Sequence, residues 1–265
     1  INITGGTDRS RYAIGGSYTS QEATMGVPNN APNTKRYNAR INSDHVVIKK
    51  NGMDILKVGE TINYKYSETD GSFGTGGIYW NGVHNMLIMS PLMFAYNQKG
   101  DYYLYADQQR DGYNWDVSNG ANKNPIAYLD YMMNQNFSRG HYMQSSFYAE
   151  VQPIKNLRIK SQFGYIMSNS SYRGYIPRYD NLTSNLRQDK DKITQSMSNS
   201  HRWSWENTAD YLFNMGNHRI DVLVGQSMEK WGFGESMSAS EYDSSFYDFK
   251  HAYLSNIPFV ASKVE

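Results

Sequence analysis

The stretch HRWSWENTADYLFNMGNHRIDVLVGQS, residues 201–227, alternates in polarity on both sides of a tight turn. Trp203 and Trp205 share one parity before the turn, whereas Glu206 and Asp210 have the other. Valines and charged residues alternate in the same way after it. A period of two residues is the mark of a β-strand with two unlike faces. One face of this hairpin therefore needs an apolar environment, either a protein core or the hydrocarbon of a membrane.

Seven segments with this pattern are predicted to be strands. They cover residues 9–19, 35–48, 55–67, 139–151, 157–168, 201–213 and 218–228. Short turns alternate strictly with long connections, which are 20–34, 68–138, 169–200 and 229–265. Outer-membrane β-barrels have this arrangement, because their periplasmic turns are short and their extracellular loops are long. A soluble sandwich has no comparable reason to keep its long loops at one end.

The charges of these segments also share a parity. Away from the end residues of each segment, the more apolar parity contains no Lys or Arg, and Glu60 is its only carboxylate. A Lys or Arg facing lipid costs roughly 2–4 kcal/mol at the bilayer midplane, so the segregation favours a membrane barrel. The opposite parity would then face the lumen, with Arg36, Arg40, Asp44, Lys57, Lys65, Arg158, Lys160, Glu206, Asp210, Arg219 and Asp221.

The composition agrees with strands and loops. The chain contains 23 Tyr and 22 Gly and has a mean hydropathy of −0.71, and aromatic residues favour strands while Gly favours turns. A net charge of +1 gives no reason to expect a nucleic-acid partner. No run of about 20 apolar residues occurs, so no transmembrane helix is predicted. Seven strands are fewer than the about 8 of the smallest bacterial barrels, so we expect a segment of a longer protein.

Motifs for chemistry are missing from the sequence. The chain has no Cys, its six His are scattered, and it has no Gly-x-Ser-x-Gly nucleophile motif. The Gly-rich stretch 71–80 lacks the Gly-Lys-Ser/Thr ending of a phosphate-binding loop. We therefore predict neither an enzyme nor a cofactor or metal site. A calcium site built from distant loop carboxylates stays open as an alternative.

The segment 68–138 is too long to be a structureless loop in a compact domain. Its apolar part, residues 79–97, predicts one short helix that ends at Ser90-Pro91. Either the segment packs on itself over the barrel mouth, or it contacts a partner. Aromatic side chains can stack on sugars or hold peptide side chains. The candidate substrate or lipoprotein contacts are Tyr79, Trp80, Tyr102, Tyr103, Tyr105, Tyr113 and Trp115.

The order and spacing of several segments resemble the SusC/RagA-type TonB-dependent outer-membrane transporters. A Gly-Gly turn precedes a Tyr and aliphatic alternation, and an Arg-x-Asn-rich strand turns into a strand ending Tyr-x-Tyr-Ser. Ser-Pro then precedes a Tyr-Asn turn, an Asn-Pro follows, and two further hairpins complete the series. The similar segments are residues 3–23, 36–67, 89–103, 124–131, 146–165 and 203–227.

This resemblance implies an all-β fold, in which the antiparallel strands form part of a barrel of about 22 strands with long extracellular loops. It also implies a bacterial outer-membrane protein that imports oligosaccharides or peptides together with a SusD-like surface lipoprotein. TonB would act through a segment outside these residues, since neither a plug domain nor a TonB box is recognised among them. Two alternatives remain: a soluble all-β binding or adhesion module, and a porin that works without TonB.

Overall fold

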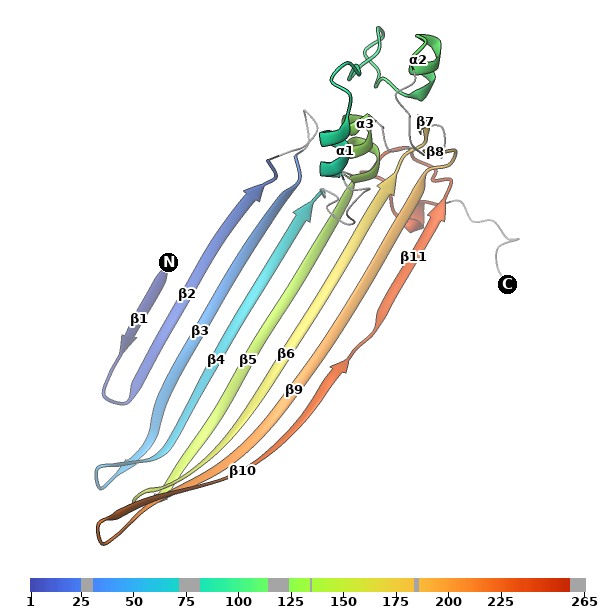
Figure 1. The fold of residues 1–265 in the computed structure, drawn as a ribbon. Coiled ribbons are helices and arrows are strands. Elements are labelled where there is room, and N and C mark those ends of the chain that lie inside the picture. Colours follow the sequence, from blue (N-terminus) through green and yellow to red (C-terminus); the bar gives the residue numbers. More distant parts are fainter. Residues whose placement is uncertain (25–30, 72–81, 114–123, 134, 184–185, 258–265) are drawn as a thin grey trace, which may run out of the picture.

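The computed structural model describes residues 1–265 apart from 25–30, 72–81, 114–123, 134, 184–185 and 258–265. Its main element is a nine-stranded antiparallel sheet, drawn in Figure 1. The strands of this sheet are β1 (Asn2–Gly6), β2 (Ser10–Glu22), β3 (Asn33–Lys50), β4 (Met53–Asp70), β5 (Asn136–Ile154), β6 (Leu157–Ile176), β9 (Lys192–Met215), β10 (His218–Phe233) and β11 (Ser236–Tyr242). A separate two-stranded sheet contains β7 (Tyr179–Thr183) and β8 (Leu186–Gln188).

Neighbouring strands follow one another along the chain, except that β9 lies beside β6 and β11 pairs with β9. The turns after β1, β3, β5 and β9 are short and lie at one end of the sheet, and the long connections gather at the other (Figure 1). Backbone conformation fits the residues at these turns. Asn51 and Gly52 have φ of 52° and 74°, as a two-residue hairpin turn of this kind requires. Asn156 and Gly216, at 67° and 62°, have the same left-handed conformation.

The pairing register shows that the apolar residues of all the long strands share one face. Residues opposite each other in a ladder lie on the same face. Ile14 pairs with Ile41 and Ile41 with Ile62, so the apolar parity continues from β2 through β4. The same relation holds through to β10. We call this surface the apolar face; it includes Tyr12, Ile14, Tyr18, Tyr37, Ile41, Ile62, Tyr64, Phe147, Ile159, Phe163, Trp203, Trp205, Tyr211, Val222 and Val224.

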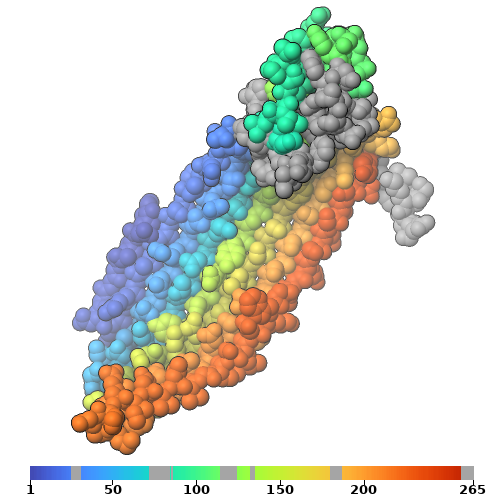
Figure 2. Space-filling view, viewed as in Figure 1, coloured from blue at the N-terminus to red at the C-terminus, as the bar shows by residue number. Residues whose placement is uncertain are grey.

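No second sheet covers the apolar face in the described part of the chain. Trp205 is 44% exposed and Val224 is 66% exposed, although a sandwich would bury such residues. The space-filling view shows the strands as one broad slab with the loops gathered at one end (Figure 2). The described hydrophobic residues that are buried lie near that end: Tyr103, Ala127, Tyr128, Leu129, Tyr175, Tyr179, Ile193 and Ala252.

A row of aromatic rings crosses the apolar face toward the end with the long connections. The Tyr18 and Tyr37 ring centroids are 4.9 Å apart, those of Tyr37 and Tyr66 are 6.0 Å apart, and those of Tyr66 and His141 are 4.8 Å apart. Two residues farther along β4, toward the long connections, Glu68 accepts a hydrogen bond of 2.6 Å from the Tyr66 hydroxyl. Aromatic rings followed by charges are typical of the interface between a bilayer and water.

The predicted boundaries were wrong in two places, and the prediction of seven strands missed four: β1 and β11 of the main sheet, and β7 and β8 of the separate sheet. β6 and β9 run through much of the expected loop 169–200, and β10 and β11 occupy part of the expected loop 229–265. The missed segments, which lie nearer the long connections, are rich in Ser and Asn and do not alternate in hydropathy. They still form strands because their backbones pair with a neighbouring strand. β1 has five residues, too few for a period of two to stand out.

Short helices fill the connection between β4 and β5. They are α1 (Gly82–Ile88), α2 (Tyr105–Arg110), α3 (Pro125–Tyr128) and a π-helical turn at Leu129–Met133. α1 ends ahead of Ser90-Pro91, as the sequence predicted, whereas α2 and α3 were not predicted. A 3₁₀ helix, η2 (Leu254–Asn256), follows β11. Among the described helices, none has the length and apolar character to cross a membrane.

Candidate functional site

The face opposite the apolar face carries the charges, and we call it the polar face. Pairing places Arg40 opposite Asn63, Lys57 opposite Glu150, and Glu150 opposite Lys160. It also places Arg158 opposite Asp210. Continued across the sheet, this register brings all the residues that were expected to face a lumen to the polar face: Arg36, Arg40, Asp44, Lys57, Lys65, Arg158, Lys160, Glu206, Asp210, Arg219 and Asp221.

Near the short turns, Tyr148 organises a cluster of charges on the polar face. Its hydroxyl donates a hydrogen bond to Asp44, two strands away. The ring can lie across β4 because Gly59 has no side chain: a Cβ there would come within 2.3 Å of Tyr148 Cε1. Lys57 Nζ lies 3.9 Å from Asp44 Oδ1, and Lys160 Nζ lies 4.7 Å from the centroid of the Tyr148 ring. The cations of this cluster therefore have an anion or an aromatic ring beside them.

Two further pairs join neighbouring strands of the polar face. Arg158 Nη2 lies 3.0 Å from Asp210 Oδ2. Farther along β9, Arg202 Nη2 lies 3.2 Å from Glu229 Oε2, and its guanidinium lies 3.2 Å from the centroid of the Trp231 ring. These side chains are partly exposed, so each pair contributes about 0–1 kcal/mol to stability. They hold side chains in place more than they stabilise the sheet.

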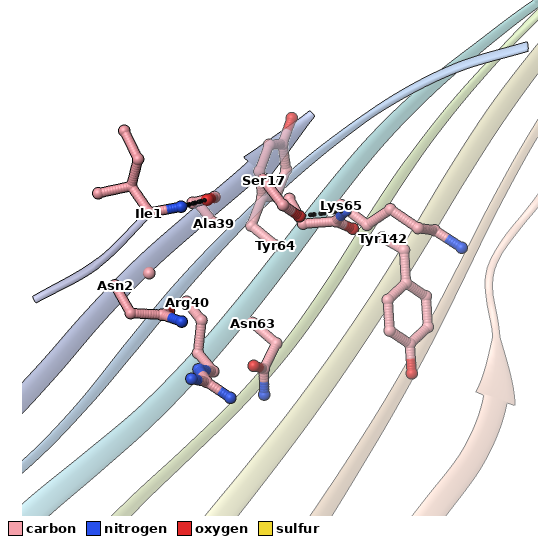
Figure 3. A pocket seen from close by; sticks show the side chains of 12 residues that line it. Ile1, Asn2, Ser17, Ala39, Arg40, Asn63, Tyr64, Lys65 and Tyr142 are labelled. Carbon is pink, nitrogen blue, oxygen red and sulfur yellow. Dashed lines mark hydrogen bonds between the residues drawn. The ribbon is translucent and has the colours of Figure 1, made fainter. Parts of the chain in front are cut away.

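A hollow lies beside the middle of β2, β3 and β4, next to Ile1 and Asn2 at the start of β1. Figure 3 shows Arg40, Asn63 and Tyr142 side by side along it. Lys65 also lines the hollow, and its Nζ lies 5.4 Å from the centroid of the Tyr142 ring. Arg40 and Lys65 were predicted from the sequence to face a lumen, whereas Asn63 and Tyr142 were not. A large aromatic residue on the parity that carries the charges was the signal that could have identified Tyr142.

The aromatic residues proposed as contacts lie in the connection 68–138, which we call the excursion, and they have different surroundings there. Tyr79, Trp80 and Trp115 lie outside the described residues. Tyr103 is only 1% exposed, and its hydroxyl donates a 3.0 Å hydrogen bond to Asp111, so its ring packs inside the excursion and offers no face to a ligand. The described residues that keep part of their surface exposed are Tyr102, Tyr105 and Tyr113.

Burial changes the acidity of the phenols in this excursion. Desolvation, together with the hydrogen bond to Asp111, raises the pKa of Tyr103 to about 12. Tyr102 donates to Asp130 at 3.2 Å, and burial followed by that carboxylate raises its pKa as well. The excursion packs against Ile176 and Tyr179, beyond the end of the polar face. Self-packing accounts for these described contacts.

A second structured segment, residues 243–257, was not predicted at all. It packs on the apolar-face side, where Ala252 is buried against Tyr175 and Ile193. Arg173 donates a 2.9 Å hydrogen bond to the carbonyl of Phe249, and its guanidinium lies 4.3 Å from the centroid of that ring. Isolated Phe and Tyr residues in a polar stretch gave no periodic pattern by which to find this contact.

Among the described residues, no three His, Cys, Asp or Glu side chains group closely enough to hold a metal ion. His141 and His201 instead make hydrogen bonds of 2.7 Å with the hydroxyls of Tyr64 and Tyr165, respectively. A calcium site built from distant loop carboxylates stays open as an alternative.

The chain is similar to known proteins in sequence and in fold. TonB-dependent receptor P3 of Formosa agariphila is 24% identical over 236 residues, which cover 87% of this chain and 21% of that protein. A chain of the RagAB peptide importer in the closed-closed state superposes with a TM-score of 0.72 at 20% identity, over 98% of this chain and 26% of that one. The open-open state gives a TM-score of 0.70 at 19% identity, with the same coverage. No family profile matches the chain.

These comparisons confirm the resemblance to SusC/RagA-type TonB-dependent transporters and the predicted fold class. The sheet has the fold of a section of the RagAB transporter chain. This chain spans about a fifth of the curated relative, at 21%, and about a quarter of the solved chain, at 26%.

Proposed function

We propose that this chain forms part of the wall of a TonB-dependent transporter in the bacterial outer membrane. One observation carries the proposal: the described sheet has a continuous exposed apolar face and an opposite face that holds the charges. Lipid would cover the apolar face, and the polar face would line the lumen. The proposal rests equally on the similarity to a TonB-dependent receptor.

The dimensions of the apolar face fit a bilayer. In β4 the face runs from Leu56 to Tyr66, a ten-residue step that spans roughly 33 Å at about 3.3 Å per residue. A strand tilt of about 40° reduces this to about 25 Å, which is the height of the apolar band of outer-membrane barrels. The tyrosine row at the upper limit of the step then lies at one interface.

The proposed activity is import of a nutrient without chemistry on it. The cargo would be an oligosaccharide or a peptide, delivered by a SusD-like surface lipoprotein, and TonB would act through a segment outside the described sheet. The long connections would lie outside the cell, because short turns face the periplasm in such barrels. The resemblance to the SusC/RagA type supports the lipoprotein partner, and the likeness to the RagAB peptide importer supports import.

Uptake by cells that carry the full-length protein tests the proposal. We expect a strain without the gene to lose uptake of at least one oligosaccharide or peptide, and the wild-type gene to restore it. Depletion of TonB should abolish that uptake, because import through a plugged lumen needs the inner-membrane motor. Uptake that persists without TonB would instead identify a porin. Purification of the full-length protein should also recover a surface lipoprotein, which mass spectrometry would identify.

A further inference from the structure

Three cations of the polar face lie close together on two neighbouring strands. Arg36 and Arg40 lie on β3 and Lys65 lies on β4, and we call them the cation field. In the described part of the chain, their side chains make no ion pair, although Lys65 lies 5.4 Å from the Tyr142 ring centroid. Nearer the short turns, by contrast, Lys57 has Asp44 beside it and Arg158 has Asp210.

The sequence of the surrounding strands leaves the cation field unneutralised. From Asn42 toward the long connections, the polar-face positions of β2, β3, β4 and β5 contain no carboxylate. Glu68 occurs at this height, but it has the parity of the apolar face and pairs with Arg139 at 3.9 Å. The three cationic side chains therefore share one face of the sheet, the face that would line the proposed lumen.

The hollow beside the field has the chemistry of a carboxylate site. A guanidinium presents its N–H donors in a planar fork that fits the two oxygens of a carboxylate, as Arg40 could. Lys65 adds a compact charge, and Asn38 and Asn63 supply neutral amides beside it. Tyr142 provides a ring on which the apolar face of a sugar or a side chain could rest.

We infer that the cation field binds the carboxylate of an anionic cargo and makes the transporter prefer such a cargo to a neutral one. This inference rests on the proposed function. The carboxylate has two possible sources, a sugar acid and an acidic amino acid, which share the same chemistry at the field. Pairing of the field with an acidic part of the plug is the rival explanation, and it predicts no preference among cargoes.

Binding measurements on the full-length protein in detergent would test the inference. The probes are a uronic-acid oligosaccharide and its neutral equivalent, and an acidic peptide and its amidated equivalent. We expect Arg40→Gln and, separately, Lys65→Gln to weaken binding of at least one acidic probe by roughly tenfold, as loss of a charge-assisted hydrogen bond does. The affinity for the neutral equivalent should change less than about twofold. Whichever acidic probe responds identifies the source of the carboxylate.

Arg219→Gln is the matched control, because Arg219 is a cation of the same face at the opposite end, near the turn between β9 and β10. A slower-migrating band after heating, on a denaturing gel, would confirm that each variant is folded. Equal losses in Arg40→Gln and Arg219→Gln, or unchanged binding in both field variants, would overturn the inference. Wild-type protein that binds the neutral probe as tightly as the acidic one would do the same. Failure of wild type to bind any probe would overturn this inference, whereas loss of TonB-dependent uptake is the separate test of the transporter proposal.

Discussion

Arginine placed on the apolar face should destabilise the barrel far more than arginine placed one residue away. Ile41 lies on that face between Ile14 and Ile62, near the middle of the step from Leu56 to Tyr66. Asn42, its neighbour, lies on the polar face, opposite Ala13 and Thr61. Ile41→Arg and Asn42→Arg add the same side chain to the same strand, so only the direction of the side chain differs.

The expected difference follows from the depth of Ile41. An Arg that faces lipid at the midplane costs roughly 2–4 kcal/mol, which lowers the ratio of folded to unfolded protein about 30- to 700-fold. The lost apolar contact of Ile41 adds to this cost. Arg at position 42 would face water and should change the free energy of unfolding by less than about 0.5 kcal/mol, as other surface substitutions do.

Urea unfolding of the full-length protein in lipid vesicles measures both free energies of unfolding. Folded protein at the cell surface, followed by heat-dependent gel migration, gives a second readout in the cell. The assignment of the faces predicts that Ile41→Arg reduces both and that Asn42→Arg reduces neither. Equal free energies of unfolding for the two variants would refute it, and a greater loss in Asn42→Arg would reverse the two faces.

Three other predictions use different parts of the sheet and loops. Val222 pairs with Tyr211 near a short turn, so Val222→Arg should cost only about 0–1 kcal/mol in the same urea assay; a loss as large as that of Ile41→Arg would contradict the depth assignment. Gly59→Ala should destabilise by about 1–3 kcal/mol because its Cβ would come within 2.7 Å of the Ser43 carbonyl oxygen, whereas Gly16→Ala, 3.8 Å from its nearest neighbour, should be nearly neutral. The pKa of Tyr103 is raised to about 12 from an unfolded value of about 10, so the neutral phenol stabilises the excursion fully below pH 10. That stabilisation should be lost as pH rises through about 12, which limited proteolysis would detect, and Tyr103→Phe should remove this pH dependence.

The membrane-facing half of the sheet could be predicted from the sequence because one physical demand acts on every strand there. Lipid on one side and water on the other force a period of two, and the register confirms that the parities chosen for separate strands agree. The halves of β6 and β9 nearer the long connections escaped prediction because loop segments and water, not lipid, surround them there, which removes that demand. Tyr148 and Gly59 illustrate a second limit, since their contact depends on which residues lie opposite each other in three strands, which no single segment encodes.

The strands are longer than a bilayer requires, and the charges of the polar face are not spread evenly along them. β9 has 24 residues and β6 has 20, whereas a tilted strand crosses a membrane with about 9–11. The sheet therefore continues well beyond the bilayer toward the long connections. Near the short turns, Asp44 lies beside Lys57 and Asp210 lies beside Arg158, so these four charges are paired within the wall. Farther along β3 and β4, from Asn42 to the level of the tyrosine row, Arg36, Arg40 and Lys65 lie on the polar face with no carboxylate on that face of β2 to β5. Neutral residues occupy the same face where the register of Lys65 continues to Tyr142, Ser168 and Ser200, so the cations kept on β3 and β4 are what the binding measurements test.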